Sequence, residues 1–522
     1  MRSTTRRPDF APVLRSEWVK FRTVRGWLIG LALAAVLCAT FTFLVANGNN
    51  SNFQPHVPTG QGGEAVADTY YVLDQPLTGD GTVTARITSL TGVISTAPSN
   101  EAASQANPGD AASGFANTRP GLAGWAKAGI LLTPSTAQGS AYAAVMATGS
   151  HGDRFQYDYT HDTAGSPGSV SATAPHWLRL TRTGDTVTGY DSANGTSWSE
   201  IATAHLAALP VTVTVGLFTT SPMTFQTSSS GARTMATATF DHVTLQGQAA
   251  SDVAGTAAAW HGQNIGGGPQ DYYPTLANGT SRQAGGSMVL SGSGDIAPAV
   301  LAAELGATTA PATLQLGLIV ALIALIVIAA MFVTAEYRRG LIRTTFAATP
   351  HRARVLGAKV VVAGGVAFAA TGLAVAVAIP LAAYVLTAKS TYVFPAGAAT
   401  DLRVIVGSAL LASLTAVGVL ALATLLRTSA AAITIGITVF VLPGIFSAAA
   451  PASGGERWLY EFTPAAALSV LQTFPTAGQV EYPYTLANGY YPLAPWAGLA
   501  VLAAYTGLAL TAAALLLKRR DA

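Results

Sequence analysis

The chain has 522 residues, of which half are hydrophobic and only 10% are charged, with a formal net charge of +3. Ordinary soluble domains carry about 25% charged residues, so this composition is typical of a chain with much of its length in a membrane. The small net charge gives no indication of a nucleic-acid partner, and we expect none.

A basic segment, residues 1–26, comes first in chain order. Leu14, Trp18, Phe21, Arg25 and Leu28 fall on one helical stripe, while the other basic residues project elsewhere. A mostly apolar stripe with basic flanks is typical of a helix that lies in the membrane interface. Positive charge alone could also serve only to orient the chain, but the aromatic residues add nothing to such a signal. We therefore predict an interfacial helix.

Six apolar runs then have about the 20 residues needed to cross a hydrocarbon core. They are 27–46, 314–333, 360–385, 405–426, 430–449 and 496–517. The run 430–449 is the weakest, because Pro443 and Gly444 interrupt it. The first run is longer than a signal-peptide core, so we expect it to remain as a span.

The distribution of Lys and Arg predicts how these runs are oriented. Basic residues gather in 1–26, in 334–359 and in the tail 518–522, whereas the intervening short loops carry few. Because basic loops stay on the cytoplasmic side, we predict a multi-pass protein of the cell membrane with both termini cytoplasmic and residues 47–310 outside. The fold class expected is a polytopic α-helical membrane protein with an inserted extracytoplasmic all-β domain. Its lone cysteine, Cys38, falls in the first span, so no intrachain disulfide is expected.

The large outer segment has the pattern of antiparallel strands. Between residues 70 and 245 short runs alternate polar and apolar side chains, as in Trp177–Arg182, and turn signals such as Thr183-Gly184-Asp185 separate them. Regularly spaced strands with Gly-rich turns predict a two-sheet sandwich. Residues 248–312 read as a connector to the second span, with a last small β element at Met288–Leu290.

Several motifs of this segment carry a resemblance. Trp125–Ile130, Phe155–Tyr157, His176–Leu180, Gly184-Asp185 and Ser192–Trp198 together resemble concanavalin A-like lectin/glucanase sandwiches. The resemblance implies a fold rather than a function, because that fold hosts binders, hydrolases and inert spacers.

Sequence chemistry leaves two interpretations of the outer aromatic residues. Stacking on sugar rings is one, and packing within the sandwich is the commoner role. The candidate ligand-facing residues are Trp125, Tyr157, Trp177 and Trp198. The acidic and histidine side chains here match no calcium-loop spacing and include no recognisable pair of catalytic carboxylates, so we expect neither a metal site nor a glycosidase; they are His151, Asp153, Asp158 and Asp162.

The basic loop 334–359 is longer than a tight turn needs. It has room for a short helix, a break at Pro350 and a second basic helix that continues into the third span. Leu14–Arg25 before the first span and Glu336–Lys359 after the second together resemble ABC-2 type exporter membrane subunits, with a composition like that of GC-rich actinobacteria. Members of this family have six spans with both ends inside. The inserted sandwich departs from compact members, in which a short loop joins the first two spans.

The resemblance implies roles for both segments. The first would be an elbow helix, whose residues are Glu17, Trp18, Lys20, Phe21 and Arg22. The second would contain the helix that docks in a groove of the ATP-binding subunit, with Glu336, Arg338, Arg339, Arg343, Arg352 and Arg354 as coupling residues. The outer segment 450–494 matches in position a re-entrant hairpin of the family.

These expectations define the predicted function. The chain holds no Gly-x-x-x-x-Gly-Lys-[Ser/Thr] loop, so we expect no enzymatic activity and no cofactor in it. A separate ATP-binding subunit would drive a homo- or heterodimer of permease subunits, and the outer domain would receive or gate cargo. The alternative is a membrane-anchored surface protein that does not transport and that binds a glycan or a protein through its sandwich.

Overall fold

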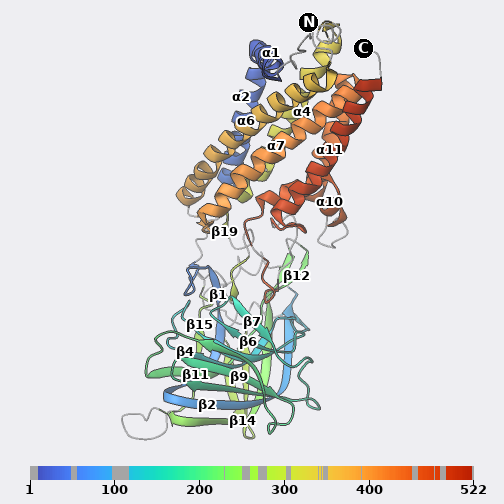
Figure 1. Ribbon diagram of the computed structural model, residues 1–522. Coiled ribbons are helices and arrows are strands. Elements are labelled where there is room, and N and C mark those ends of the chain that lie inside the picture. Colours follow the sequence, from blue (N-terminus) through green and yellow to red (C-terminus); the bar gives the residue numbers. More distant parts are fainter. Residues whose placement is uncertain are drawn as a thin grey trace, which may run out of the picture. The chain divides into compact units, whose positions relative to one another are not determined.

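The computed structural model describes residues 10–519 except 49–55, 97–116, 228–229, 250–258, 269–278, 301–306, 339, 342–343, 345–350, 390, 449–456, 475 and 482–488. The chain divides into two compact units. The helical unit takes in Met1–Asn52, Gly306–Pro475 and Tyr484–Ala522. The β unit takes in Phe53–Leu305 and Thr476–Pro483 (Figure 1).

The helical unit consists of apolar helices joined by short segments. Its α-helices are α1 (Phe10–Thr23), α2 (Arg25–Gly48), α4 (Leu314–Arg338), α6 (Arg352–Ala388), α7 (Ala398–Leu426), α8 (Ser429–Phe440), α9 (Leu442–Ala448), α10 (Arg457–Phe462) and α11 (Pro495–Arg519). Two 3₁₀ helices, η2 (Pro311–Thr313) and η3 (Pro464–Leu471), and a short parallel pair, β19 (Ala307–Thr308) with β20 (Tyr392–Val393), complete it. Within the described residues, five helices are long and apolar enough to cross a membrane: α2, α4 with η2, α6, α7 and α11.

The fifth expected span differs from the prediction. The described residues of this run, 430–448, form two short helices, α8 and α9, with a break at Val441. Pro443 has no N–H to donate to the preceding turn and its ring crowds that turn, which explains the break. Six continuous spans are therefore not confirmed. The third span is longer than expected, because α6 begins at Arg352, as the helix predicted after Pro350 requires.

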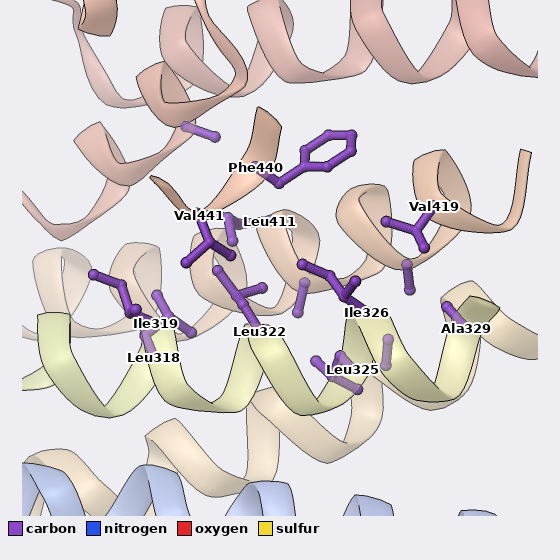
Figure 2. Close-up of a cluster of buried hydrophobic side chains, with 14 of the residues drawn as sticks. Leu318, Ile319, Leu322, Leu325, Ile326, Ala329, Leu411, Val419, Phe440 and Val441 are labelled. Carbon is purple, nitrogen blue, oxygen red and sulfur yellow. The ribbon is translucent and has the colours of Figure 1, made fainter. Parts of the chain in front are cut away.

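The core of the helical unit lies around α4. Leu322 and Ile326 of this helix are buried and point toward α7, Phe440 and Val441 (Figure 2). On the other side α4 approaches the backbone of α2 closely. An added Cβ at Gly317 would lie 2.4 Å from the Cys38 carbonyl oxygen, so glycine permits this packing.

The β unit is built from many antiparallel strands. They are β1 (Val66–Asp68), β2 (Tyr70–Ser95), β3 (Thr118–Pro120), β4 (Lys127–Thr133), β5 (Ala143–Thr148), β6 (Asp153–Tyr157), β7 (His161–Ala164), β8 (His176–Thr183), β9 (Thr186–Ser192), β10 (Ser199–His205), β11 (Thr212–Thr220), β12 (Thr224–Thr227), β13 (Ser230–Ala232), β14 (Thr234–Ala249), β15 (His261–Ile265), β16 (Thr280–Ala284), β17 (Ser287–Gly292) and β18 (Ile296–Pro298).

The long strand β2 belongs to both layers of the sandwich. Its first part, Tyr71–Thr78, pairs with β11, from which β4, β5, β6 and β7 follow in order. Its second part, Gly81–Ile87, pairs with β8, and β9 and β10 follow. Gly79, at φ +72°, lies between the two parts. A single strand with a bend therefore connects the layers, and the main apolar core fills the space between them.

Strands β4 and β5 of the first layer are buried on both faces. Ile130 and Val145 point into the main core, whereas their neighbours Leu131, Ala144 and Met146 join a second cluster on the opposite face. Successive side chains of a strand point to opposite faces, so a layer covered on both sides is apolar throughout. The second cluster also contains Tyr159.

The predicted sandwich is confirmed, with one correction. The small β element predicted at Met288–Leu290 is β17, which pairs with β14, but residues 248–312 also supply β15, which pairs with β2. Strands from this stretch therefore extend the sheet. Their short runs lack the strong alternation that marks the other strands.

Candidate functional site

Four charged side chains from three separate segments meet inside the helical unit. Lys359 Nζ of α6 donates to Glu17 Oε2 of α1 at 2.6 Å and to Glu336 Oε1 of α4 at 2.8 Å. Lys20 Nζ donates to the same two residues, at 2.6 Å to Glu17 Oε1 and at 3.1 Å to Glu336 Oε1. We call Glu17, Lys20, Glu336 and Lys359 the charge cluster.

The charge cluster is neutral and largely removed from solvent. The side chains of Glu17 and Lys359 are 1% and 4% exposed, and that of Lys20 is 38% exposed. Burying a lone ion costs several kcal/mol, whereas alternating signs with direct hydrogen bonds offset that cost. Removing one buried member therefore leaves another buried charge without compensation.

An aromatic group encloses the cluster on one side. The rings of Phe21, Trp27 and Phe332 lie 5.2–5.5 Å apart pairwise, and two of the three pairs are edge-on. Lys359 Nζ lies 4.6 Å from the centroid of the Phe332 ring, a cation–π contact. The rings and the charges together fix the angle at which α1 meets α4 and α6.

The elbow residues predicted from sequence divide into two sets. Glu17, Lys20 and Phe21 face the helical unit, while Trp18 is 44% exposed and Arg22 is exposed. The predicted single stripe from Leu14 to Leu28 is wrong, because the helix breaks at Val24 and Leu28 belongs to α2. The buried face of α1 is organised by Glu17 and Phe21, with Trp18 on the outer side.

Burial and charge pairing have opposite effects on the pKa of Lys20. Partial burial by itself lowers the pKa of this ammonium, but the hydrogen bond and charge of Glu17, supported by Glu336, outweigh it and raise the pKa above its usual value. Lys20 therefore stays charged at physiological pH, as neutrality of the cluster requires.

The same end of the helical unit is rich in cations. Arg352 Nη1 donates to the Leu517 carbonyl oxygen at 3.0 Å, and the Arg427 guanidinium lies 5.4 Å from the Tyr337 ring centroid. Positive groups at helix C-termini satisfy carbonyls and complement the helix dipole. The C-terminal ends of α4, α7 and α11 thus lie together with α1 and the start of α6 (Figure 1).

The remaining predicted coupling residues have different environments. Arg338 is exposed at the end of α4, and Arg354 is half-buried in the first turn of α6. Arg339 and Arg343 lie outside the described residues. The sequence analysis did not assign Lys359 to the site. The available signal was a single lysine placed directly before the apolar run 360–385.

The opposite end of the helical unit is aromatic. Phe394 is edge-on to Phe474 at 4.9 Å, and Tyr490 lies 6.2 Å from Phe474. Every residue of η3 is buried, and Ser469 Oγ donates to backbone oxygens at the start of α11. The described residues 457–474 and 489–494 of the segment 450–494 therefore belong to the helical unit, and the re-entrant hairpin stays a prediction.

In the β unit, the four candidate aromatic residues do not form one platform. Trp125 stacks on His151 at 4.0 Å, and Tyr157 stacks on His161 at 4.1 Å. The Arg179 guanidinium lies 3.8 Å from the ring centroid of Trp198, and that of Arg86 lies 5.4 Å from the ring centroid of Trp177. Each ring thus has a cationic or imidazole neighbour at its face, and their role in ligand binding stays a prediction.

The acidic residues of the same region are paired locally. Asp153 Oδ1 lies 2.6 Å from His176 Nδ1, and Asp162 accepts hydrogen bonds from Arg154 and Gln156. The hydrogen bond to Asp153 raises the pKa of His176. Among the residues that the structure describes, no group of three or more His, Cys, Asp or Glu side chains could hold a metal ion.

Comparisons with known proteins add little. No family model matches the chain, and no curated protein matches it. Among solved structures, a Saccharomyces cerevisiae protein of unknown function is 12% identical, with 38% of this chain and 85% of that one covered and a TM-score of 0.21. Two structures of scytalido-glutamic peptidase with transition-state analogues are 9% and 10% identical, each covering 43% of this chain and 98% of the peptidase, with TM-scores of 0.25 and 0.24.

Proposed function

We propose that this chain is the membrane-spanning permease subunit of an ATP-driven ABC-2 type exporter, coupled to a separate ATP-binding subunit. The observation that carries the proposal is the charge cluster. It joins α1 to the end of α4 and to the start of α6, the two helices that flank the basic loop 339–351. A force applied to that loop would therefore reach three helices at once.

The distribution of charge supports an external source of energy. The sequence has no phosphate-binding loop of its own, and the Asp, Glu, Lys and Arg residues of the apolar helices lie toward their ends, as Glu336 and Arg403 do. Ion-coupled transporters usually hold such residues within their spans. Closure of an ATP-binding dimer against residues 334–359 would instead rock the helices of a homo- or heterodimer toward an outward-open state.

The end with the cations is the docking side in this proposal. Arg338 at the end of α4 and Lys518 and Arg519 at the end of α11 are exposed, and by the positive-inside bias this end faces the cytoplasm. The β unit is then extracytoplasmic, where it receives or gates cargo.

The test is co-purification of an ATP-binding subunit from native membranes in detergent. We expect a stoichiometric ATPase with the wild-type chain and about tenfold less with Arg338→Glu, since a reversed charge at a docking surface opposes association. Arg282→Glu, at an exposed position on β16, is the matched control and should retain the ATPase.

Two results would contradict the proposal. One is the absence of any co-purified ATPase, which would favour a surface-binding protein anchored by its helices. The other is equal recovery with Arg338→Glu and Arg282→Glu, which would separate the cationic end from the partner. Glycan arrays on the full-length protein would then examine the alternative.

A further inference from the structure

A short segment that follows η3 in sequence is folded into the β unit rather than the helical unit. Thr476–Pro483 belongs to the β unit, whereas the residues on either side of it belong to the helical unit. The chain therefore passes between the two units four times, and two of these passages flank this segment alone. We call the described residues 476–481 the strap.

Two side chains hold the strap on the β unit. Gln479 is 5% exposed, and its Nε2 donates to the Tyr159 carbonyl oxygen at 2.7 Å. Glu481 Oε2 accepts from the Trp125 backbone N–H at 3.0 Å. A hydrogen bond that involves a carboxylate is stronger than one between neutral groups, and a buried amide requires its partner.

The atoms that receive the strap are fixed by the β unit itself. Tyr159 has φ +60°, and its hydroxyl donates to Asp68 Oδ2 at 2.8 Å and to the Ser140 carbonyl oxygen. Backbone in the left-handed region persists in a non-glycine residue only where its surroundings impose it. The Tyr159 carbonyl is thus held in position before the strap binds.

The second contact is equally constrained. Trp125 is 6% exposed and stacked on His151. A Cβ at Gly124 would lie 3.1 Å from Glu481 Oε2 and 2.8 Å from Ser150 Oγ, so the carboxylate fits where there is no side chain. A preformed site with this shape lowers the entropy cost of binding an extended peptide.

The chain on both sides of the strap is anchored in the helical unit. Gln472 donates to the Phe474 carbonyl oxygen at 3.0 Å and accepts from the Tyr491 N–H at 3.1 Å. Only four residues separate Phe474 from Gln479. The element before the strap and the element after it also pack on each other. A Cβ at Gly498, at the start of α11, would lie 2.0 Å from the Ala466 carbonyl oxygen of η3.

We propose that the Trp125–Tyr159 surface of the β unit is a binding site for this chain's own strap, and that the bound strap restrains η3 and the start of α11. Release of the strap would loosen these two elements. The inference does not depend on an ATPase.

Hydrogen exchange on the purified full-length protein in detergent tests both parts of the proposal. In the double variant Gln479→Ala/Glu481→Ala we expect exchange of the strap and of the Trp125 amide to rise about tenfold. We also expect faster exchange at 466–472 and 495–499. Exchange in β5 should stay unchanged, which shows that the β unit remains folded.

The control makes the same chemical changes at exposed positions of the β unit, Gln283→Ala/Glu200→Ala, and should leave all these amides unaffected. Unchanged protection of Trp125 in the strap variant would overturn the binding site. Loss of the Trp125 protection without any change at 466–472 or 495–499 would contradict the proposed restraint on η3 and α11. Because no partner is present, neither result bears on the proposed ATPase.

Discussion

At the residue scale, the buried charges matter most for what the chain can tolerate. Lys359 balances two carboxylates with a side chain that is 4% exposed, whereas Lys20 contacts the same carboxylates at 38% exposure. Water can therefore replace the ammonium of Lys20 more readily than that of Lys359. The two lysines form a natural comparison.

We expect Lys359→Met to lower the free energy of unfolding of the helical unit by about 3–5 kcal/mol, because Glu17 and Glu336 lose a buried partner. Lys20→Met should cost roughly 1 kcal/mol, as for a partly solvated ion pair. Thermal unfolding in detergent measures both. Equal unfolding midpoints for the two variants would show that burial does not make the Lys359 ion pairs more stabilising than those of Lys20.

A second prediction at this scale concerns Asp68. Burial raises the pKa of its carboxyl group to about 6, despite hydrogen bonds from the Gly139 N–H and the Tyr159 hydroxyl. The folded chain keeps this proton up to about pH 6, whereas the unfolded chain loses it near 3.8. The folded state thus binds more protons between these values, and its stability falls as pH rises through this window.

Replacing the Asp68 carboxyl group with an amide removes this loss of stability at higher pH. Asp68→Asn keeps an oxygen that accepts hydrogen bonds, so we expect the β unit to gain up to about 3 kcal/mol above pH 6 and nothing near pH 4. Tryptophan fluorescence during denaturation at pH 4, 6 and 8 measures the difference. Asp80→Asn, at an exposed position of β2, is the control; a parallel pH profile for wild type and Asp68→Asn would refute the assignment.

At the element scale, the helices pack where glycine lets backbones approach. Gly317 of α4 lies against the Cys38 carbonyl oxygen and the Thr42 hydroxyl of α2, whereas Gly365 of α6 has no atom within 4 Å of its added Cβ. Both glycines lie within apolar helices. The difference between them is tertiary and is invisible in the local sequence.

Gly317→Ala should therefore destabilise the helical unit by about 1–3 kcal/mol through overpacking. Gly365→Ala should leave it unchanged or stabilise it by up to about 1 kcal/mol, because alanine is the better helix former. Unfolding in detergent with increasing SDS compares the two variants. A stabilising Gly317→Ala would mean that α2 and α4 are not in close contact.

At the scale of the whole molecule, the proposal places the cationic end of the helical unit inside and the β unit outside. Arg338 and Arg282 are exposed positions at the end of α4 and on β16, and the native Cys38 is buried. Single cysteines at these two positions therefore report the orientation of the chain without interference from Cys38.

We expect Arg282→Cys to react with a membrane-impermeant maleimide in intact cells, and Arg338→Cys to react only after the membrane is opened. The physical reason is that basic loops are retained on the cytoplasmic side. Labelling of Arg338→Cys in intact cells would contradict the proposed orientation. Full protection of both positions until lysis would place the β unit inside.

The sequence by itself determined the classes of element and their order. Apolar runs of about 20 residues and alternating strands such as Trp177–Arg182 are local patterns, because the backbone geometry of one element sets its period and its surroundings set which face is apolar. They predicted the helices and the sandwich. The distribution of basic and apolar residues also singled out Leu14–Arg25 and Glu336–Lys359, the two segments that supply the charge cluster.

Only the tertiary structure decided which side chains meet. Lys359 lies 342 positions from Glu17, and Glu481 lies 356 positions from Trp125, so no local period relates them. The bend of β2 between two layers and the transfer of the strap to the β unit arise for the same reason. Packing and the pairing of buried polar groups select them over the whole chain, after local preference has fixed the elements.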